Sequence, residues 1–337
     1  MTVALTLKQV EDLTRQALIA SNVAPGNAES VTRSVVASEA DGIHSHGLAR
    51  LPTYCEHARC GKIDGHAQAT VREVARAGLQ ANAQGGFAHP AIDVGMEQFL
   101  PRVRETGIAA LAVTHSYNCG VLGYHMERIA DAGFVALGFV NAPASIAPWG
   151  GKNPVFGTNP LACAVPRADA PPLVIDQSSS VVAKSEIVVH KQKGEAIPEG
   201  WALDAEGNPT TDPDAALAGG SMVPMGGYKG AGIALIVEIM AAAVTGANFA
   251  LDASSFADNK GGSPGTGQFF IGIDPAAFAG QDFPQRLEYL LSAIADQEGA
   301  RLPGQGRLAA RARTATEGIE IGDALHEKIR GYTQAAG

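Results

Sequence analysis

The segment Asp41–Arg50 carries three side chains that can do chemistry within six residues. Ser45 and His46 can exchange protons, and Arg50 can bind a planar carboxylate through parallel hydrogen bonds. The surrounding pattern predicts helix, so His46 and Arg50, four positions apart, would share one helical face. We therefore expect His46 to handle a proton and Arg50 to hold an acid.

A metal site is the competing interpretation of the nine histidines. His44 and His46 form an HxH pair, and His115 and His125 follow later in the chain. The sequence contains no HExxH motif and no Cys/His cluster at zinc spacing. It therefore predicts no metal site.

Three loops have the composition of an anion site. Gly226–Gly232 contains Lys229 and leads into an apolar helix, where free amides and the helix dipole favour a phosphate. A glycine-rich turn into a buried helix explains that pattern equally well. Arg301–Arg307 places two arginines around a turn, although taken alone a solvated linker is the better interpretation. Asn118–Leu122 joins a buried strand to a helix, and the three loops together indicate a cofactor with several phosphates.

The usual nucleotide-binding motifs are absent: the sequence has no strand–GxGxxG–helix unit followed by an acid, and no Walker loop. Glu186 is a further candidate, although its local pattern is that of an exposed acid at an edge. It gains a role only if the fold brings it to Ser45 and His46. There, an acid would orient the pair and raise the imidazole pKa.

Helical and stranded stretches alternate along the chain and must position these groups. Residues 7–22 predict a helix with Thr6 as N-cap and Gln9 completing a capping box. Other helices are expected over 27–40, 48–60, 89–103, 126–132, 233–244, 285–297 and 321–332, and strands over 70–88, 107–113, 134–140, 161–165, 172–175 and 268–273. Residues 193–220 are rich in Gly, Pro and Asp and predict a surface loop.

Length and composition are those of a globular chain of 337 residues with two or three substructures. The net charge is -9 without a run of Lys or Arg, so we expect no nucleic-acid partner. No window approaches the ~18 apolar residues of a membrane span. The start lacks an export signal and no cysteines form a CxxC pair, which predicts a cytoplasmic protein with free thiols at Cys55, Cys60, Cys119 and Cys163.

Five runs spread over nearly the whole chain together resemble the malate/L-lactate dehydrogenase type 2 family: Asp41–Arg50, Phe156–Leu161, Asp176–Ser180, Gly227–Gly230 and Leu302–Gly304. The resemblance implies an α/β (α+β) fold. A helical N- and C-terminal part, residues 1–75 and 300–337, would pack on a non-Rossmann NAD(P)-binding sheet domain, residues 76–299. It also implies NADPH as cofactor, with NADH possible, and a homodimer that builds its pocket across a subunit boundary.

The resemblance also implies roles for single residues. His46 resembles the proton donor with Ser45 in its relay, Arg50 the clamp for the carboxylate of a small substrate, and Thr158 a second substrate contact. The positions that match the family's dinucleotide contacts are Asn118, Cys119, Gly120, Val121, Leu122, Asp176, Gln177, Ser178, Lys229, Gly230, Arg301, Leu302, Pro303, Gly304, Gln305, Gly306 and Arg307.

Glu186 favours one branch of the family. The imine-reducing branch has an acid there, an Asp, which completes a Ser-His-acid relay, whereas hydroxyacid dehydrogenases have a non-acidic residue. An imidazolium suits a C=N bond, because a protonated imine accepts hydride more readily. We therefore predict NAD(P)H-dependent reduction of Δ1-pyrroline-2-carboxylate to L-proline and of Δ1-piperideine-2-carboxylate to L-pipecolate.

Two alternatives stay open. The loop Ser116–Gly120 departs from the imine-reducing branch, so a 2-hydroxyacid dehydrogenase of the same family, acting on malate, lactate or a ureidoglycolate-like acid, is the first. The second is a non-catalytic dinucleotide-binding or scaffold protein. This second alternative gives no reason for Ser45, His46 and Arg50 to occur together.

Overall fold

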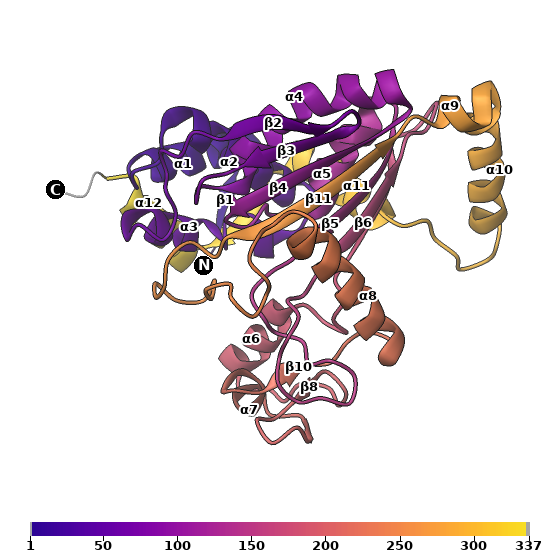
Figure 1. Ribbon diagram of the computed structural model, residues 1–337. Helices are drawn as coiled ribbons and strands as arrows, with labels where there is room; N and C mark the ends of the chain where they lie inside the picture. The colour runs from indigo at the N-terminus through magenta and orange to yellow at the C-terminus, as the bar shows by residue number, and fades with distance from the viewer. Residues whose placement is uncertain (1, 335–337) are drawn as a thin grey trace.

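Within residues 2–334, which this computed structural model describes, a mixed sheet of seven strands forms the centre of the molecule (Figure 1). The strand order is β2-β3-β4-β11-β5-β6-β7; β3 and β4 pair in parallel and the other neighbours pair antiparallel. The strands are β2 (Thr70–Ala75), β3 (Gly78–Asn82), β4 (Ile108–Ser116), β5 (Val135–Val140), β6 (Leu161–Val165), β7 (Leu173–Gln177) and β11 (Thr266–Ile273).

Helices cover both faces of this sheet. On one face, α4 (Ala88–Thr106) and α5 (Leu122–Asp131) enclose the main apolar core, whose large members include Leu79, Phe99 and Phe270. On the other face, α8 (Tyr228–Glu238) and the π-helical turn η2 (Ile239–Ala243) pack against β5, β6 and β11. No helix of the described chain is both long and apolar enough to cross a membrane.

The two ends of the chain form one helical part beside the sheet. The helices α1 (Leu7–Ile19), α2 (Pro25–Ala40) and α3 (Leu51–Arg59) share an apolar core with the strand β12 (Ile319–Gly322) and the helix α12 (Asp323–Tyr332). The strand β1 (Thr2–Leu5) pairs with β12, and the expected Thr6–Gln9 capping box begins α1. The α/β fold class, with joined N- and C-terminal helices packed on a sheet, is confirmed.

A small unit forms where the sequence predicted a surface loop over 193–220. Its elements are α6 (Lys184–Lys193), β8 (Ala202–Leu203), β9 (Pro209–Thr210), α7 (Pro213–Leu217) and β10 (Ser221–Met222). They enclose a separate core around Ile146, Phe156 and Ile187. The loop prediction is wrong because strands of two residues are too short to produce a recognisable period.

Two helices stand away from the body of the molecule, at the right of Figure 1. These are α9 (Pro275–Ala279) and α10 (Phe283–Ala295), joined by the 3-10 turn η3 (Gly280–Asp282). Together they form an arm, residues 275–295. Its largest side chains face solvent: Phe278 is 71% exposed and Tyr289 81%. The chain then returns through α11 (Gln305–Glu317) to the helical part.

Candidate active site

The sheet brings two of the predicted segments to the same edge. β4, β5 and β7 run in one direction because antiparallel partners separate them, so their carboxyl ends meet. Asn118 follows β4, and Asp176 lies near the end of β7. Ligands of α/β sheets commonly bind outside the carboxyl ends of the strands. This edge is therefore the starting point for the site.

The segment Asp41–Arg50 is not helical. The helix α2 ends at Ala40, Gly42 adopts a φ of +74°, and a single 3-10 turn, η1 (His44–His46), follows. The prediction that His46 and Arg50 share one helical face is therefore wrong. The left-handed glycine stops the helix, and Arg50 instead directly precedes α3.

Glu39 of α2 holds this turn from beneath. Its buried carboxylate accepts a hydrogen bond of 2.6 Å from the Leu48 amide and contacts His44 Nδ1 at 2.6 Å. A Cβ atom on Gly47 would lie 2.1 Å from the same carboxylate, so only glycine fits there. His44 is thereby held apart from His46. Across residues 2–334, no three His, Cys, Asp or Glu side chains are placed to hold a metal ion.

Ser45 and His46 form a hydrogen-bonded pair. Ser45 Oγ lies 3.0 Å from His46 Nδ1, and the Nε2 atom has no hydrogen-bond partner within the described chain. The imidazole is accessible to solvent but lies among surrounding protein atoms. This desolvation, together with the positive charge of Arg50, lowers the pKa of His46 to about 4. At neutral pH, His46 is therefore an uncharged base.

Arg50 is a cation framed by aromatic rings. Its guanidinium carbon lies 5.9 Å from the centre of the Tyr54 ring and 5.4 Å from that of Phe256. No carboxylate of the described chain pairs with it. The guanidinium is therefore free to bind the carboxylate of a ligand, while contacts with the ring faces hold it in place.

A hydrogen-bonded network joins this cation to the predicted cofactor loop. Tyr54 donates to Asn118 Oδ1 at 2.7 Å, and the Gly120 amide donates to the same oxygen at 3.2 Å. Tyr117 Oη lies 2.8 Å from His57 Nδ1. Burial raises the pKa of both phenols, that of Tyr117 to about 12, although the charge of Arg50 opposes the rise. Both phenols stay protonated.

A second group of predicted residues meets at the start of α5. The Asp176 carboxylate accepts a hydrogen bond of 2.7 Å from the Gly123 amide. A Cβ on Gly304 would lie 3.2 Å from the Val174 carbonyl oxygen, so loop 301–307 passes directly beside β7. Desolvation raises the pKa of Asp176, against the opposing effects of the Gly123 hydrogen bond and the Arg307 charge.

Lys229 and Gly230 open α8 beside the end of the same strand. The Met225 amide donates to the Ser179 carbonyl at 2.9 Å, which joins the two segments. A Cβ on Gly230 would lie 1.8 Å from the Met225 carbonyl oxygen, so glycine is required at this turn. Neither α8 nor α11 has a side-chain cap, so both helices present free amides, next to the exposed cations Lys229 and Arg301. These donors fit the phosphates of a dinucleotide.

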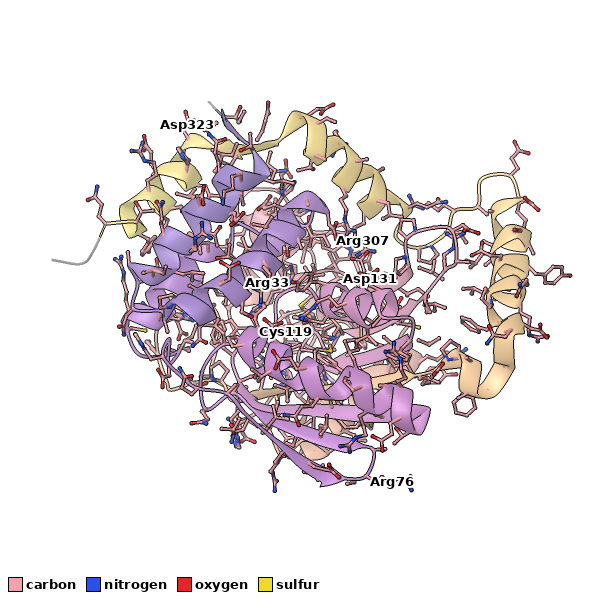
Figure 2. The ribbon with its side chains drawn as sticks, turned by 90° about the horizontal axis from the view of Figure 1, so that it is seen from above. Arg33, Arg76, Cys119, Asp131, Arg307 and Asp323 are labelled. Carbon is pink, nitrogen blue, oxygen red and sulfur yellow. The ribbon has the colours of Figure 1, made fainter. Side chains whose placement is uncertain are left out.

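Arg307 has carboxylate partners already. It bonds Glu127 at 2.9 Å and Asp41 at 3.4 Å, and Arg311, one turn along α11, bonds the same two acids. Figure 2 shows Arg307 where α11 meets the sheet domain. Burial would raise the pKa of Glu127, but both arginines outweigh it and lower the pKa. This cluster ties α11 to α5 and to the start of segment Asp41–Arg50.

The remaining predicted residues are placed less directly. Glu186 lies in the first turn of α6, and its exposed carboxylate makes no hydrogen bond or ion pair within the described chain. It therefore does not contact Ser45 or His46 here.

Thr158 is half-buried, and its carbonyl accepts the Ser179 amide at 2.8 Å. The buried members of the predicted cofactor loops are Cys119, Val121, Leu122, Gly230 and Leu302, and the exposed ones are Asp176, Gln177, Lys229, Arg301, Pro303, Gln305 and Gly306.

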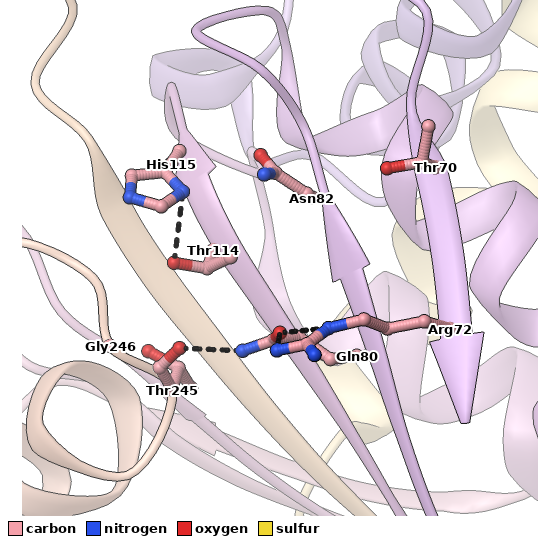
Figure 3. Close-up of a pocket in the computed structure, with 8 residues that line it drawn as sticks. All are labelled: Thr70, Arg72, Gln80, Asn82, Thr114, His115, Thr245 and Gly246. Carbon is pink, nitrogen blue, oxygen red and sulfur yellow. Dashed lines mark hydrogen bonds between the residues drawn. The ribbon is translucent and has the colours of Figure 1, made fainter. Parts of the chain in front are cut away.

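A separate cavity of about 380 Å³ opens on the sheet face opposite α4 (Figure 3). Its lining is polar. Arg72 donates to Gln80, and Gln80 donates to the Thr245 carbonyl at 3.0 Å. The complete lining is Thr70, Arg72, Gln80, Asn82, Thr114, His115, Thr245 and Gly246. No residue predicted for the active site belongs to it.

Comparison with known proteins decides the family. A model of the malate/L-lactate dehydrogenase family matches residues 5–330. The chain belongs to this family. It is accordingly an oxidoreductase, and the resemblance found in the five sequence runs is confirmed.

Its relatives include two kinds of enzyme. The chain is 47% identical to a (2R)-3-sulfolactate dehydrogenase (NADP(+)) of Chromohalobacter salexigens, over 97% of both chains. It is 36% identical to a Δ1-pyrroline-2-carboxylate/Δ1-piperideine-2-carboxylate reductase of Pseudomonas aeruginosa, over 97% of this chain and 98% of the relative. The solved Δ1-piperideine-2-carboxylate reductase from Pseudomonas syringae matches with a TM-score of 0.93 and 34% identity, over 98% of this chain and 99% of that one.

Two buried histidines support the loop Asn118–Leu122 from behind. The rings of His89 and His125 lie 5.8 Å apart, and His125 Nε2 lies 2.8 Å from the Cys119 carbonyl oxygen. Neither Nδ1 atom has a partner within the described chain. Burial lowers the pKa of His89 to about 4 and that of His125 to about 3. Both rings are neutral in the folded protein.

Stability should therefore fall in mild acid. Between pH 6.5 and pH 4 the unfolded chain protonates both histidines while the folded chain does not, so the unfolding free energy decreases as pH falls. Each histidine lowers the unfolding free energy by roughly 1.4 kcal/mol for each pH unit by which the pH falls in this range. Urea unfolding of wild type and His125→Gln over this range should show a clearly shallower pH dependence in the variant. Exposed His66, changed to Gln, is the control, and equal slopes for wild type and His125→Gln would contradict the assignment.

Proposed function

We propose that this chain is an NADP-dependent dehydrogenase that interconverts the C2 hydroxyl and carbonyl groups of a small 2-hydroxy acid. The observation that carries the proposal is the hydrogen-bonded pair of Ser45 and His46 beside Arg50, a cation that no acid of the described chain pairs with. An uncharged imidazole suits removal of a hydroxyl proton. The relative at 47% identity is named (2R)-3-sulfolactate dehydrogenase (NADP(+)), and since sulfolactate is a 2-hydroxy acid, it supports both the substrate class and the cofactor.

In this proposal, different residues carry out binding and proton transfer. A nicotinamide dinucleotide bound at the Asp176, Lys229 and Arg301 segments would supply the hydride acceptor. Arg50 binds the substrate carboxylate and so fixes the position of C2. When Nδ1 of His46 carries its proton and donates to Ser45 Oγ, the Nε2 lone pair is available and takes the hydroxyl proton. In the reverse direction, the same nitrogen returns it.

Reduction of cyclic imines is the second candidate. Glu186, an acid at the position typical of that branch, favours it, as do relatives such as the 36% identical reductase. Imine reduction also takes a proton from His46, but the Glu186 carboxylate that would complete the relay makes no contact with Ser45 or His46 in the described chain. We rank hydroxyacid oxidation first because the 47% identical relative supports it.

One spectrophotometric screen tests both candidates. The absorbance of NADPH and NADH is followed with 3-sulfolactate, malate and lactate in the oxidative direction. The reductive direction uses the matching 2-oxo acids and the two cyclic imines. We expect turnover of a hydroxy acid and its 2-oxo acid, with NADP preferred over NAD. Turnover of the imines alone would replace the proposal by the second candidate. No turnover with any compound would favour a non-catalytic dinucleotide-binding protein.

We also infer a homodimer in which two copies of the chain cover each other's apolar faces. Part of α8 and η2 is exposed although apolar: Ile236 is 54% exposed and Ile239 45%. The arm, residues 275–295, adds Phe278, Tyr289 and Leu290. Apolar surface of this extent is unusual on a monomer. Sedimentation equilibrium should give twice the chain mass, and Ile236→Glu should lower it; a monomeric wild type would contradict the inference.

A cytoplasmic location is part of the same proposal. All four cysteines are free thiols, and two of them, Cys55 and Cys119, are buried in the apolar interior. Such unpaired thiols are typical of a reducing compartment. Fractionation of the producing cells, followed by detection of the chain, would test this; recovery outside the cytoplasm would contradict it.

A further inference from the structure

One side of the Arg50 site is built by a loop far away in sequence. Residues 251–264 connect the region after η2 to β11 without forming a helix or strand. Most of this loop is exposed, but Phe256 turns inward and joins the apolar core of the helical part. The conformation of Phe256 therefore depends on whatever holds the loop in place.

Lys62 holds this loop through its backbone. The lysine lies just after α3, and its side chain is 0% exposed. Its ammonium group donates three hydrogen bonds to carbonyl oxygens of the loop, at 2.5 Å to Ser255, 2.8 Å to Asp258 and 2.7 Å to Lys260. All three donors of the ammonium group are thereby used. A fully buried lysine needs such hydrogen-bond partners, since burial of an unpaired charge costs much free energy.

Phe256 faces the predicted carboxylate clamp. Its ring centre lies 5.4 Å from the Arg50 guanidinium carbon and 5.0 Å from the Tyr117 ring centre, at an interplanar angle of 61°. Tyr54 flanks the same guanidinium at 5.9 Å. Tyr54 belongs to a helix and Tyr117 directly follows a strand, whereas Phe256 depends on the loop. Arg50 thus contacts one fixed ring, that of Tyr54, and the ring of Phe256, which Lys62 keeps in position.

We propose that Phe256 is a specificity-determining residue for the acid substrate, acting through the orientation of Arg50, and that Lys62 is the positioning residue that keeps Phe256 there. The proposal rests on the proposed function, because it assumes that Arg50 binds the substrate carboxylate. It adds Phe256, the inward-facing residue of loop 251–264, to the wall of the substrate site. Substitutions of Phe256 are expected to change which acids are accepted while leaving the predicted cofactor loops intact.

Phe256→Ala removes the ring while leaving the loop anchored. We expect KM for the acid substrate to rise about 3- to 30-fold, the range that corresponds to one cation–π contact. The kcat value and the Kd for NADPH should stay within about a factor of two of wild type. Leu251→Ala is the matched control, since Leu251 is an apolar residue of the same loop and is 62% exposed. It should behave as wild type.

A double-mutant cycle separates specific from general effects. If Phe256 acts through Arg50, then Phe256→Ala should have no further effect on KM in an Arg50→Ala background. Full additivity, or an unchanged KM in the single variant, would overturn the proposal. Failure of the proposed function is distinguishable, because wild type itself would then turn over no hydroxy acid.

Lys62→Met tests the anchor. It should reproduce the rise in KM and also increase hydrogen–deuterium exchange and protease cleavage within residues 251–264, whereas Lys260→Met, a change of an exposed lysine in the loop, should do neither. Lys62→Arg, which keeps the buried charge, serves if the methionine variant does not fold. Unchanged exchange in the loop of a folded Lys62 variant would overturn the positioning role.

Discussion

Replacing His46 by alanine should lower kcat for the hydroxyacid reaction by roughly 10²- to 10⁴-fold, the usual contribution of a general acid or base. The Kd for NADPH should change little, because His46 lies in segment Asp41–Arg50, outside the loops that we assign to the cofactor. Steady-state kinetics gives kcat, and fluorescence titration with NADPH gives the Kd. A kcat unchanged in a folded variant would remove His46 from the mechanism.

Two further variants serve as comparisons for this fall in kcat. Ser45→Ala keeps the imidazole but removes the 3.0 Å hydrogen bond to Nδ1, so the fall in kcat should be smaller than for His46→Ala. His66→Ala changes an exposed histidine whose ring contacts Asn22, and it should leave kcat unchanged. An equal loss in all three variants would indicate a general effect on folding rather than on proton transfer.

The pH dependence follows from the lowered pKa of His46. A base whose pKa is about 4 is deprotonated over the whole neutral range, so kcat/KM for oxidation should stay flat as far as His46 is concerned. It should fall only as pH approaches 4, when the imidazole takes up a proton. The fall should therefore vanish in His46→Ala, measured on the residual activity. A loss centred near pH 6.5 instead would show that the imidazole is not desolvated in the free enzyme.

Local pattern was sufficient for much of the fold. The Thr6–Gln9 capping box begins α1 as expected, and the apolar run 107–113 lies in the largely buried β4 from Ile108 onward. Short or aperiodic structure was not predictable in this way. A left-handed Gly42 and the three-residue turn η1 replaced the expected helix, because one glycine conformation outweighs the helical pattern around it.

The candidate site was predictable only where its residues carry chemistry of their own. Ser45, His46 and Arg50 stand in one short segment and could be found by type. Glu39 could have been found, since it continues the buried face of α2 marked by Val31 and Val35, where an acid needs a partner. Phe256 and Lys62 could not. Their roles depend on contacts between residues almost two hundred positions apart, which no local pattern records.

Arg50→Ala should weaken binding of the acid substrate far more than binding of the cofactor. Charge-assisted hydrogen bonds to a carboxylate contribute roughly 1.5–3 kcal/mol, so kcat/KM should fall about 10- to 10²-fold, mainly through KM. Arg50→Lys should recover part of the loss, because it keeps the charge but not the planar fork. Arg59→Ala is the control, since Arg59 contacts Tyr332 and Ser21, away from Arg50.

The surroundings of Arg50 make this test unusually clean. Arg50 has no acidic partner in the described chain, so its removal leaves no carboxylate uncompensated and should cost little stability. The rings of Tyr54 and Phe256 would remain beside the vacated space, at distances suited to contact with a cation. Added guanidinium ion should therefore restore part of kcat/KM in Arg50→Ala but not in His46→Ala. If instead Arg50→Ala weakened only the binding of NADPH, Arg50 would belong to the cofactor site, and the carboxylate of the substrate would have to be held elsewhere.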